Sequence, residues 1–230
     1  MKLPTPALSL LLLAALAQPA LAEPSATDWP NLAAYRERNA ALLAQPTSAR
    51  RVVFMGDSIT QGWPLEALRP GFVNRGISGQ TTPQMLLRFR ADVLALAPRA
   101  VVILAGTNDL AGNTGPATPE MIEGNIASMA ELAKAHHVRV VIGALLPAAA
   151  YPWAPGVQPA PAIAEINAWL RRYARREGHA FVDFHTPMAD AGQGLLKAYS
   201  EDGVHPNAAG YAVMNDLVLA ALGRLGEARP

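Results

Sequence analysis

Three residues have the types that nucleophilic catalysis requires: Ser58, Asp202 and His205. Ser58 directly follows a short apolar run, and a serine at the carboxyl end of a buried strand lies where α/β sheets bind ligands. Asp202 precedes His205 by three residues, close enough in a tight loop for the carboxylate to orient the imidazole. The other ring nitrogen could then take the serine proton. Each feature also has an ordinary structural explanation, because serines often begin helices and such Asp–His pairs are commonly surface turns.

The other four histidines compete for the role of base. His136 and His137 lie at the end of a predicted helix, where positive charge suits the helix dipole. His179 falls in a turn between a helix and a strand. His185 follows a predicted strand, so it is the one rival to His205 that the sequence leaves open.

Ester hydrolysis also needs hydrogen-bond donors for the oxyanion of the tetrahedral intermediate. Asn108 follows a second apolar run and can offer its side-chain amide. Gly79 lies in a loop with a second glycine and can offer a backbone N–H, as can Ser58. The structural alternatives are a turn glycine with positive φ and an asparagine that caps a helix.

Composition bounds the class of protein. The 230 residues are 51% hydrophobic with a formal net charge of +1, which suits one globular domain and gives no reason to expect nucleic acid as a partner. No cysteine is present, so disulfides and thiol chemistry are excluded. The sequence has no G-x-S-x-G elbow, phosphate-binding glycine motif or zinc motif, so we predict no metal and no cofactor.

The first 22 residues have the features of a secretory signal. Lys2 precedes an apolar run over 7–17, and Ala-Leu-Ala at 20–22 is a cleavage site. The run is too short for a stable membrane anchor, so we expect export to the periplasm or the medium. The expected mature chain is one domain, 23–230, with an N-terminal helical extension over 23–48. The oligomeric state is not indicated.

Apolar runs and helical spacing alternate along the chain. Strands are predicted at 52–55, 72–74, 101–104, 138–144 and 180–183, and helices at 28–43, 65–68, 83–96, 119–136, 163–173 and from 207. This order predicts an α/β fold with about five parallel strands covered on both faces. The carboxyl ends of parallel strands share one edge, so Ser58 and Asn108 should meet there. His205 can join them if the last helix packs beside the first strand.

Four blocks of the sequence carry a family resemblance. They are Gly-Asp-Ser-Ile-Thr at 56–60, Asn-Arg-Gly-Ile-Ser-Gly at 74–79, Gly-Thr-Asn-Asp at 106–109 and Asp-Gly-Val-His-Pro at 202–206. In this order they resemble the SGNH (GDSL) hydrolases, with Ile59 in place of leucine. The resemblance implies a flavodoxin-like three-layer αβα sandwich and metal-independent ester hydrolysis. It also places Gly79 at the oxyanion position. The stretches 74–82 and 202–211 are most similar to platelet-activating-factor acetylhydrolase catalytic subunits.

The segment 146–162 is expected to border the site. It is rich in proline, which lowers the entropy of ordering it, and Tyr151 and Trp153 offer flat faces for a sugar or aryl group. The other loops expected at the site are small and polar, so we expect short acyl groups, acetyl above all, on a carbohydrate or other small-molecule alcohol.

Two alternatives stay open on the sequence alone. The first is a lysophospholipase or acyl-thioesterase, in which Leu145, Leu146 and Trp153 would form an acyl groove. The second is a non-catalytic carbohydrate-binding module, in which Trp63, Tyr151 and Trp153 would stack on sugars.

Overall fold

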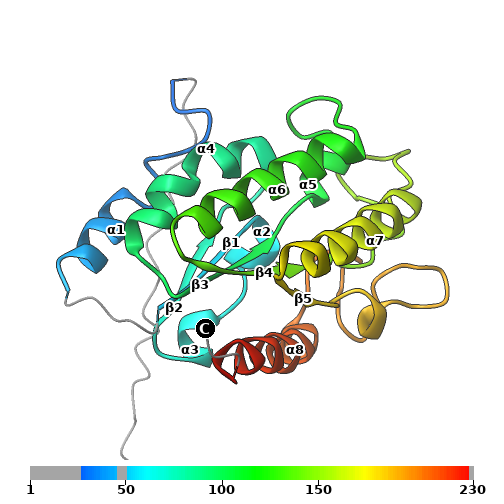
Figure 1. Cartoon of the computed structure of the whole chain (residues 1–230). Coiled ribbons are helices and arrows are strands. Elements are labelled where there is room, and N and C mark those ends of the chain that lie inside the picture. Colours follow the sequence, from blue (N-terminus) through cyan, green and yellow to red (C-terminus); the bar gives the residue numbers. More distant parts are fainter. Residues whose placement is uncertain (1–26, 46–50, 228–230) are drawn as a thin grey trace, which may run out of the picture.

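The computed structural model describes residues 27–45 and 51–227, so the predicted signal sequence lies outside the described residues. Its centre is one sheet of five parallel strands in the order β2-β1-β3-β4-β5 (Figure 1). The strands are β1 Val52–Gly56, β2 Phe72–Gly76, β3 Ala100–Leu104, β4 Arg139–Gly143 and β5 Ala180–Val182. All five were predicted from the sequence. Their order is the flavodoxin-like one that the resemblance implied.

Helices cover both faces of the sheet. They are α1 Arg36–Leu43, α2 Ser58–Gln61, α3 Leu65–Leu68, α4 Thr82–Asp92, α5 Thr107–Leu110, α6 Pro119–Ala135, α7 Ala160–Glu177 and α8 Ala208–Glu227, with 3₁₀ turns at Leu94–Leu96 and Thr186–Met188. Alternate residues of each central strand enter two separate core clusters. Val53 and Val101 pack with α4, α6 and α7, whereas Val52 and Val102 pack with α3 and α8 on the other face. The result is the predicted three-layer sandwich.

Several helix boundaries differ from the sequence-based expectation, and the helix expected over 83–96 ends at Asp92, before a separate 3₁₀ turn. The Asp28 carboxylate does cap its own turn by accepting from the N–H groups of Leu32 and Ala33, but regular helix begins only at Arg36. Helix α7 begins at Ala160, inside the segment expected to be irregular. Pro161 fits there because the first turn of a helix has no use for its missing N–H.

Two glycines let α2 lie directly over the ends of β1 and β2. A Cβ atom on Gly56 would fall 2.1 Å from Thr60 Oγ1, and one on Gly76 would fall 2.1 Å from the backbone nitrogen of Gln61. Gly56 and Gly76 are also paired in the parallel register of the two strands. Any side chain at these positions would push α2, and Ser58 with it, away from the sheet.

We therefore predict that Gly76→Ala destabilises the protein, by about 1–3 kcal/mol as for overpacking elsewhere. Gly124→Ala is the matched control, because Gly124 lies in α6 with no atom within 4 Å of a new Cβ. It should stabilise slightly, by about 0.5–1 kcal/mol. Chemical denaturation of the two variants checks this, and equal stability of both would contradict the role given to the close approach of α2.

Candidate active site

Ser58 lies at the first position of α2, immediately after β1. The chain turns sharply at Asp57, whose carboxylate caps the helix by accepting from the Ile59 N–H at 3.0 Å. Ser58 is half-buried, and its own N–H belongs to the first helical turn, which has no intrahelical acceptors. The serine therefore presents both a hydroxyl and a backbone donor at the carboxyl edge of the sheet.

Asp202 and His205 lie in a loop that is held by its own hydrogen bonds. Asp202 Oδ1 accepts from the N–H groups of Val204 and His205 at 2.9 and 2.8 Å, and from the Ser200 hydroxyl. Gly203 has a φ of +80°, a conformation that glycine adopts without strain. The loop thus shapes itself around the aspartate.

A continuous hydrogen-bonded line joins the three predicted catalytic residues. Ser58 Oγ lies 2.9 Å from His205 Nε2, and His205 Nδ1 lies 2.6 Å from Asp202 Oδ2. This is the arrangement in which an imidazole can take the serine proton while the carboxylate orients the ring. Among the described residues, the imidazole bonded to Ser58 is that of His205. The rival His185 instead lies beside Asp183, which accepts from its backbone N–H.

Contacts between α2 and α8 fix the distance between serine and histidine. The Tyr211 hydroxyl of α8 donates to the Ile59 carbonyl of α2 at 2.8 Å. The Trp63 indole N–H donates to Asn215 Oδ1 at 2.7 Å. Because α8 begins directly after the His205 loop, these bonds tie that loop to α2, which carries Ser58, and to the turn that follows α2.

The predicted oxyanion donors lie on neighbouring loops. Gly56, Gly76 and Leu104 stand in register at the ends of β1, β2 and β3, so the loops that follow share one edge. Asn108 is 3% exposed, and one of its amide N–H groups donates to the Gln80 carbonyl at 3.0 Å. Gly79 has a φ of +76°. The structure brings these loops together, and the role of each donor in hydrolysis stays a prediction.

A buried polar network holds the glycine loop, the loop of Gly79 and Gln80 after β2. Arg88 is fully buried and donates to Gln80 Oε1, to Asp92 and to the Gly56 carbonyl. Gln80 Nε2 in turn donates to the Pro30 carbonyl. The N-terminal extension is therefore bonded directly to the loop of Gly79. The sequence analysis did not identify Arg88, although a charged residue between apolar Met85 and Phe89 was a signal.

The two aromatic residues expected to contact substrate have different environments. The Trp153 side chain is 42% exposed, and its ring centroid lies 6.1 Å from that of His205. Tyr151 is only 1% exposed and stacks on Trp153 from inside. The expectation that Tyr151 offers a face to a sugar is therefore wrong, because its ring belongs to the core. Trp63, which the binding-module alternative required, is likewise 1% exposed.

Burial and hydrogen bonding perturb the carboxylates in opposite directions. Burial raises the pKa of Asp57 to about 7, against the Ile59 N–H and the charge of His205, which lower it. Burial also raises the pKa of Asp109, despite hydrogen bonds from Thr82. At Asp202 burial acts the same way, but the bonds from His205 and Val204 outweigh it and hold the pKa well below its usual range. Asp202 is thus kept ionised beside the imidazole.

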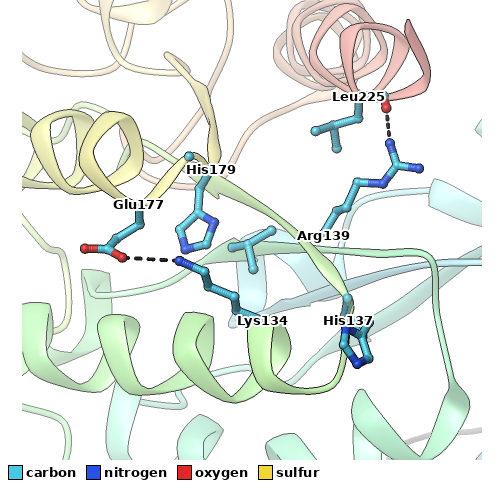
Figure 2. Close-up of a pocket in the computed structure, with 9 residues that line it drawn as sticks. Lys134, His137, Arg139, Glu177, His179 and Leu225 are labelled. Carbon is cyan, nitrogen blue, oxygen red and sulfur yellow. Dashed lines mark hydrogen bonds and ion pairs between the residues drawn. The ribbon is translucent and has the colours of Figure 1, made fainter. Parts of the chain in front are cut away.

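A hollow lies at the end of the sheet opposite to Ser58 (Figure 2). Arg139 on its wall is the first residue of β4, so the hollow is at the amino ends of the strands, away from Ser58. Two cationic side chains that line the hollow already have partners: Lys134 pairs with Glu177 at 3.5 Å, and Arg139 donates to the Leu225 carbonyl. No nucleophile bonded to a base lines it among the described residues, so we assign it no chemistry.

Two further searches cover only the described part of the chain. In residues 27–45 and 51–227, no group of three or more His, Asp or Glu side chains is placed to hold a metal ion. Within the same ranges, no helix has the length and apolar character needed to cross a membrane.

Comparison with known proteins agrees with this geometry. Residues 54–213 match the GDSL-like lipase/acylhydrolase family. The chain is 33% identical to esterase TesA of Pseudomonas aeruginosa over 185 residues, which are 72% of this chain and 84% of TesA. It is 44% identical to the crystal structure of a GDSL-like lipase from Bacteroides thetaiotaomicron, with a TM-score of 0.80 over 85% of this chain and 98% of that one.

A more distant likeness concerns the fold alone. The acetylxylan esterase Axe2 of Geobacillus stearothermophilus is 21% identical, with a TM-score of 0.62 over 76% of this chain and 95% of that one. The finer resemblance to platelet-activating-factor acetylhydrolase subunits stays a prediction.

The raised pKa of Asp57 predicts a pH-dependent stability. Between its ordinary value of 3.8 and about 7, the folded protein holds a proton that the unfolded chain has lost. The stability from this group therefore falls as the pH rises through that window. Asp57→Asn cannot ionise but keeps the acceptor for the Ile59 N–H. The melting temperature of this variant, relative to that of the wild type, should therefore rise from pH 4 to pH 8.

Asp202→Asn is the control with the opposite sign. The pKa of Asp202 is lowered in the folded state, so its ionised carboxylate stabilises the folded protein above the ordinary pKa of an aspartate, and this stabilisation is lost in acid. The melting temperature of Asp202→Asn, relative to that of the wild type, should therefore fall as the pH rises. If the melting temperature of Asp57→Asn follows that of the wild type at every pH, the carboxyl of Asp57 does not titrate as described.

Proposed function

Because the chain belongs to the GDSL-like lipase/acylhydrolase family, we propose that this ester-hydrolysing enzyme is an exported serine esterase for short acyl esters, acetyl esters of carbohydrates above all. The observation that carries the proposal is the line from Ser58 Oγ through the His205 imidazole to the Asp202 carboxylate, with separations of 2.9 and 2.6 Å. Residues 1–22 support export, as a signal sequence with a cleavage site after Ala22.

In the proposed reaction, His205 Nε2 takes the proton of Ser58 as Oγ forms a bond to the ester carbonyl carbon. The tetrahedral intermediate collapses with cleavage of the bond to the alcohol oxygen, and the imidazolium gives its proton to that leaving alcohol. Water then loses a proton to His205 and attacks the acyl-enzyme, and Ser58 leaves with the proton returned. Asp202 stabilises the imidazolium at each stage.

The negative charge that develops on the carbonyl oxygen needs donors that are already in place. We assign this role to the N–H groups of Ser58 and Gly79 and to the Asn108 amide. The support is positional: the three residues follow strands that end in register, and Asn108 is bonded to the carbonyl next to Gly79.

Burial favours a short acyl group over a long one. The long-chain alternative requires Leu145 and Leu146 to line a groove, but these side chains are 1% and 3% exposed. Leu145 belongs to the core cluster on one face of the sheet and Leu146 to the cluster on the other. The exposed ring of Trp153 lies beside His205, which protonates the leaving alcohol. We therefore place a flat alcohol group, such as a sugar ring, against Trp153.

The first test of this function concerns nucleophile and base. Ser58→Ala and His205→Ala should each lower kcat for p-nitrophenyl acetate by about 10⁴-fold or more, as for other triads. His185→Ala is the matched control and should keep kcat, because His185 is not bonded to Ser58. If His185→Ala were inactive and His205→Ala active, His205 would not be the base. A folded Ser58→Ala variant that keeps its activity would end the proposal.

The second test concerns the acyl group. On p-nitrophenyl esters of two to twelve carbons, kcat/KM should be highest at two to four carbons, because Leu145 and Leu146 are buried and do not offer their side chains to a long acyl chain. Trp153→Ala should raise KM for acetylated sugars more than for ethyl acetate. A maximum at eight carbons or more, or a preference for acyl thioesters, would favour the lipid alternative.

A further inference from the structure

A line of hydrogen bonds runs from the exposed aromatic platform to the predicted oxyanion hole, and Asn113 is its central member. The Trp153 indole N–H donates to Asn113 Oδ1 at 3.1 Å. Asn113 Nδ2 donates to Asn108 Oδ1 at 3.0 Å and to the Gly79 carbonyl at 3.1 Å. Asn113 thus contacts two of the three predicted oxyanion donors without itself being one.

The two ends of this line give it a direction. An indole N–H can only donate, and a backbone carbonyl can only accept. Trp153 therefore requires the oxygen of Asn113 on its side, which turns Nδ2 toward Asn108. The Gln80 carbonyl at the other end requires Nδ2 of Asn108, which turns Oδ1 toward Asn113.

The direction matters because an asparagine amide can be reversed. A half-turn of the Asn108 side chain would exchange Nδ2 with Oδ1 at nearly the same positions. Its oxygen would then face both the Gln80 carbonyl and the developing oxyanion, and catalysis would lose a donor and gain a repulsion. Only the orientation found here leaves the second N–H of Asn108 for the substrate.

We propose that Asn113 is a positioning residue that holds the Asn108 amide in the catalytic orientation, and that the Trp153 indole sets the orientation of Asn113. This inference rests on the oxyanion role proposed for Asn108. It gives Trp153 two roles, since the ring that would carry the alcohol also fixes the direction of the amide that would stabilise the oxyanion.

The position of Asn113 makes the proposal testable. Its side chain is exposed in the loop after α5, so substitution removes little packing and should leave the fold intact. Asn113→Asp keeps the shape and still accepts from Trp153, but its second oxygen would face Asn108 Oδ1. Because a bond to a carboxylate is stronger than a bond to a carbonyl, the Asn108 amide should reverse to donate to it.

We therefore expect Asn113→Asp to lower kcat by about tenfold or more, towards the about 10²–10³-fold loss expected of Asn108→Ala. Asn113→Ala removes the neutral bond to Asn108 without adding a charge and should cost less, about two- to tenfold. KM should change little in either variant. In the Asn108→Ala background, Asn113→Asp should have no further effect on kcat, because the amide through which it acts is gone.

Two further variants separate this mechanism from others. Thr114→Asp introduces the same charge one residue along the exposed loop, where the Thr114 hydroxyl is hydrogen-bonded to the Thr81 hydroxyl, and it should keep kcat. Trp153→Phe keeps an aromatic ring over Tyr151 but removes the indole donor. It should lower kcat by about twofold or more, and not at all in the Asn113→Ala background.

The outcomes distinguish this inference from the function on which it rests. If Asn108→Ala keeps its kcat, the oxyanion assignment itself fails. If Asn108→Ala is impaired but Asn113→Asp lowers kcat by the same factor in the Asn108→Ala background as in the wild type, Asn113 acts on the substrate or through its charge. The positioning role is then overturned. An unchanged kcat in Trp153→Phe would overturn the part given to the indole.

Discussion

The site depends on how closely a four-residue helix approaches the ends of two strands. Gly56 and Gly76 leave no side chain between α2 and the sheet, and a single methyl group at either position would collide with atoms of α2. Ser58 is held at the carboxyl edge for this reason, in reach of the imidazole proposed as its base. That imidazole, of His205, comes from the far end of the chain, and two hydrogen bonds from α8 to α2 and to Trp63 just after it set its distance from Ser58.

The remaining groups are positioned by polar contacts rather than by apolar packing. Arg88 and Asp92 form a fully buried pair, which is costly to desolvate and gains only if every donor and acceptor is satisfied. Here the guanidinium is shared among Asp92, Gln80 and the Gly56 carbonyl, so it joins α4, the glycine loop and the end of β1. Hydrogen bonds have direction, which apolar packing lacks, and a site that must aim N–H groups at one point needs that property.

The sequence predicted most of the framework but less of the environment of individual side chains. Strand positions follow from short apolar runs, and the order of the four blocks predicted which loops would share an edge. It did not show that Tyr151 and Trp153, two residues apart, face the core and the solvent respectively, because segment 146–159 has no regular period. Asn113 was equally hidden, since two of its partners, Gly79 and Trp153, lie 34 residues before it and 40 residues after it in the sequence.

The path of the chain after β4 explains why we look for specificity on the alcohol side. At its end the chain passes between the two helical layers, and consecutive residues must enter opposite cores. Leu145 and Leu146 do so, and both side chains are buried in the two core clusters, as are the rings of Tyr151 and Trp63. Trp153 remains as the large apolar side chain exposed beside His205 among the described residues. In the proposed reaction an apolar contact at that place meets the leaving group and not the acyl chain, because the proton that His205 would return goes to the alcohol oxygen.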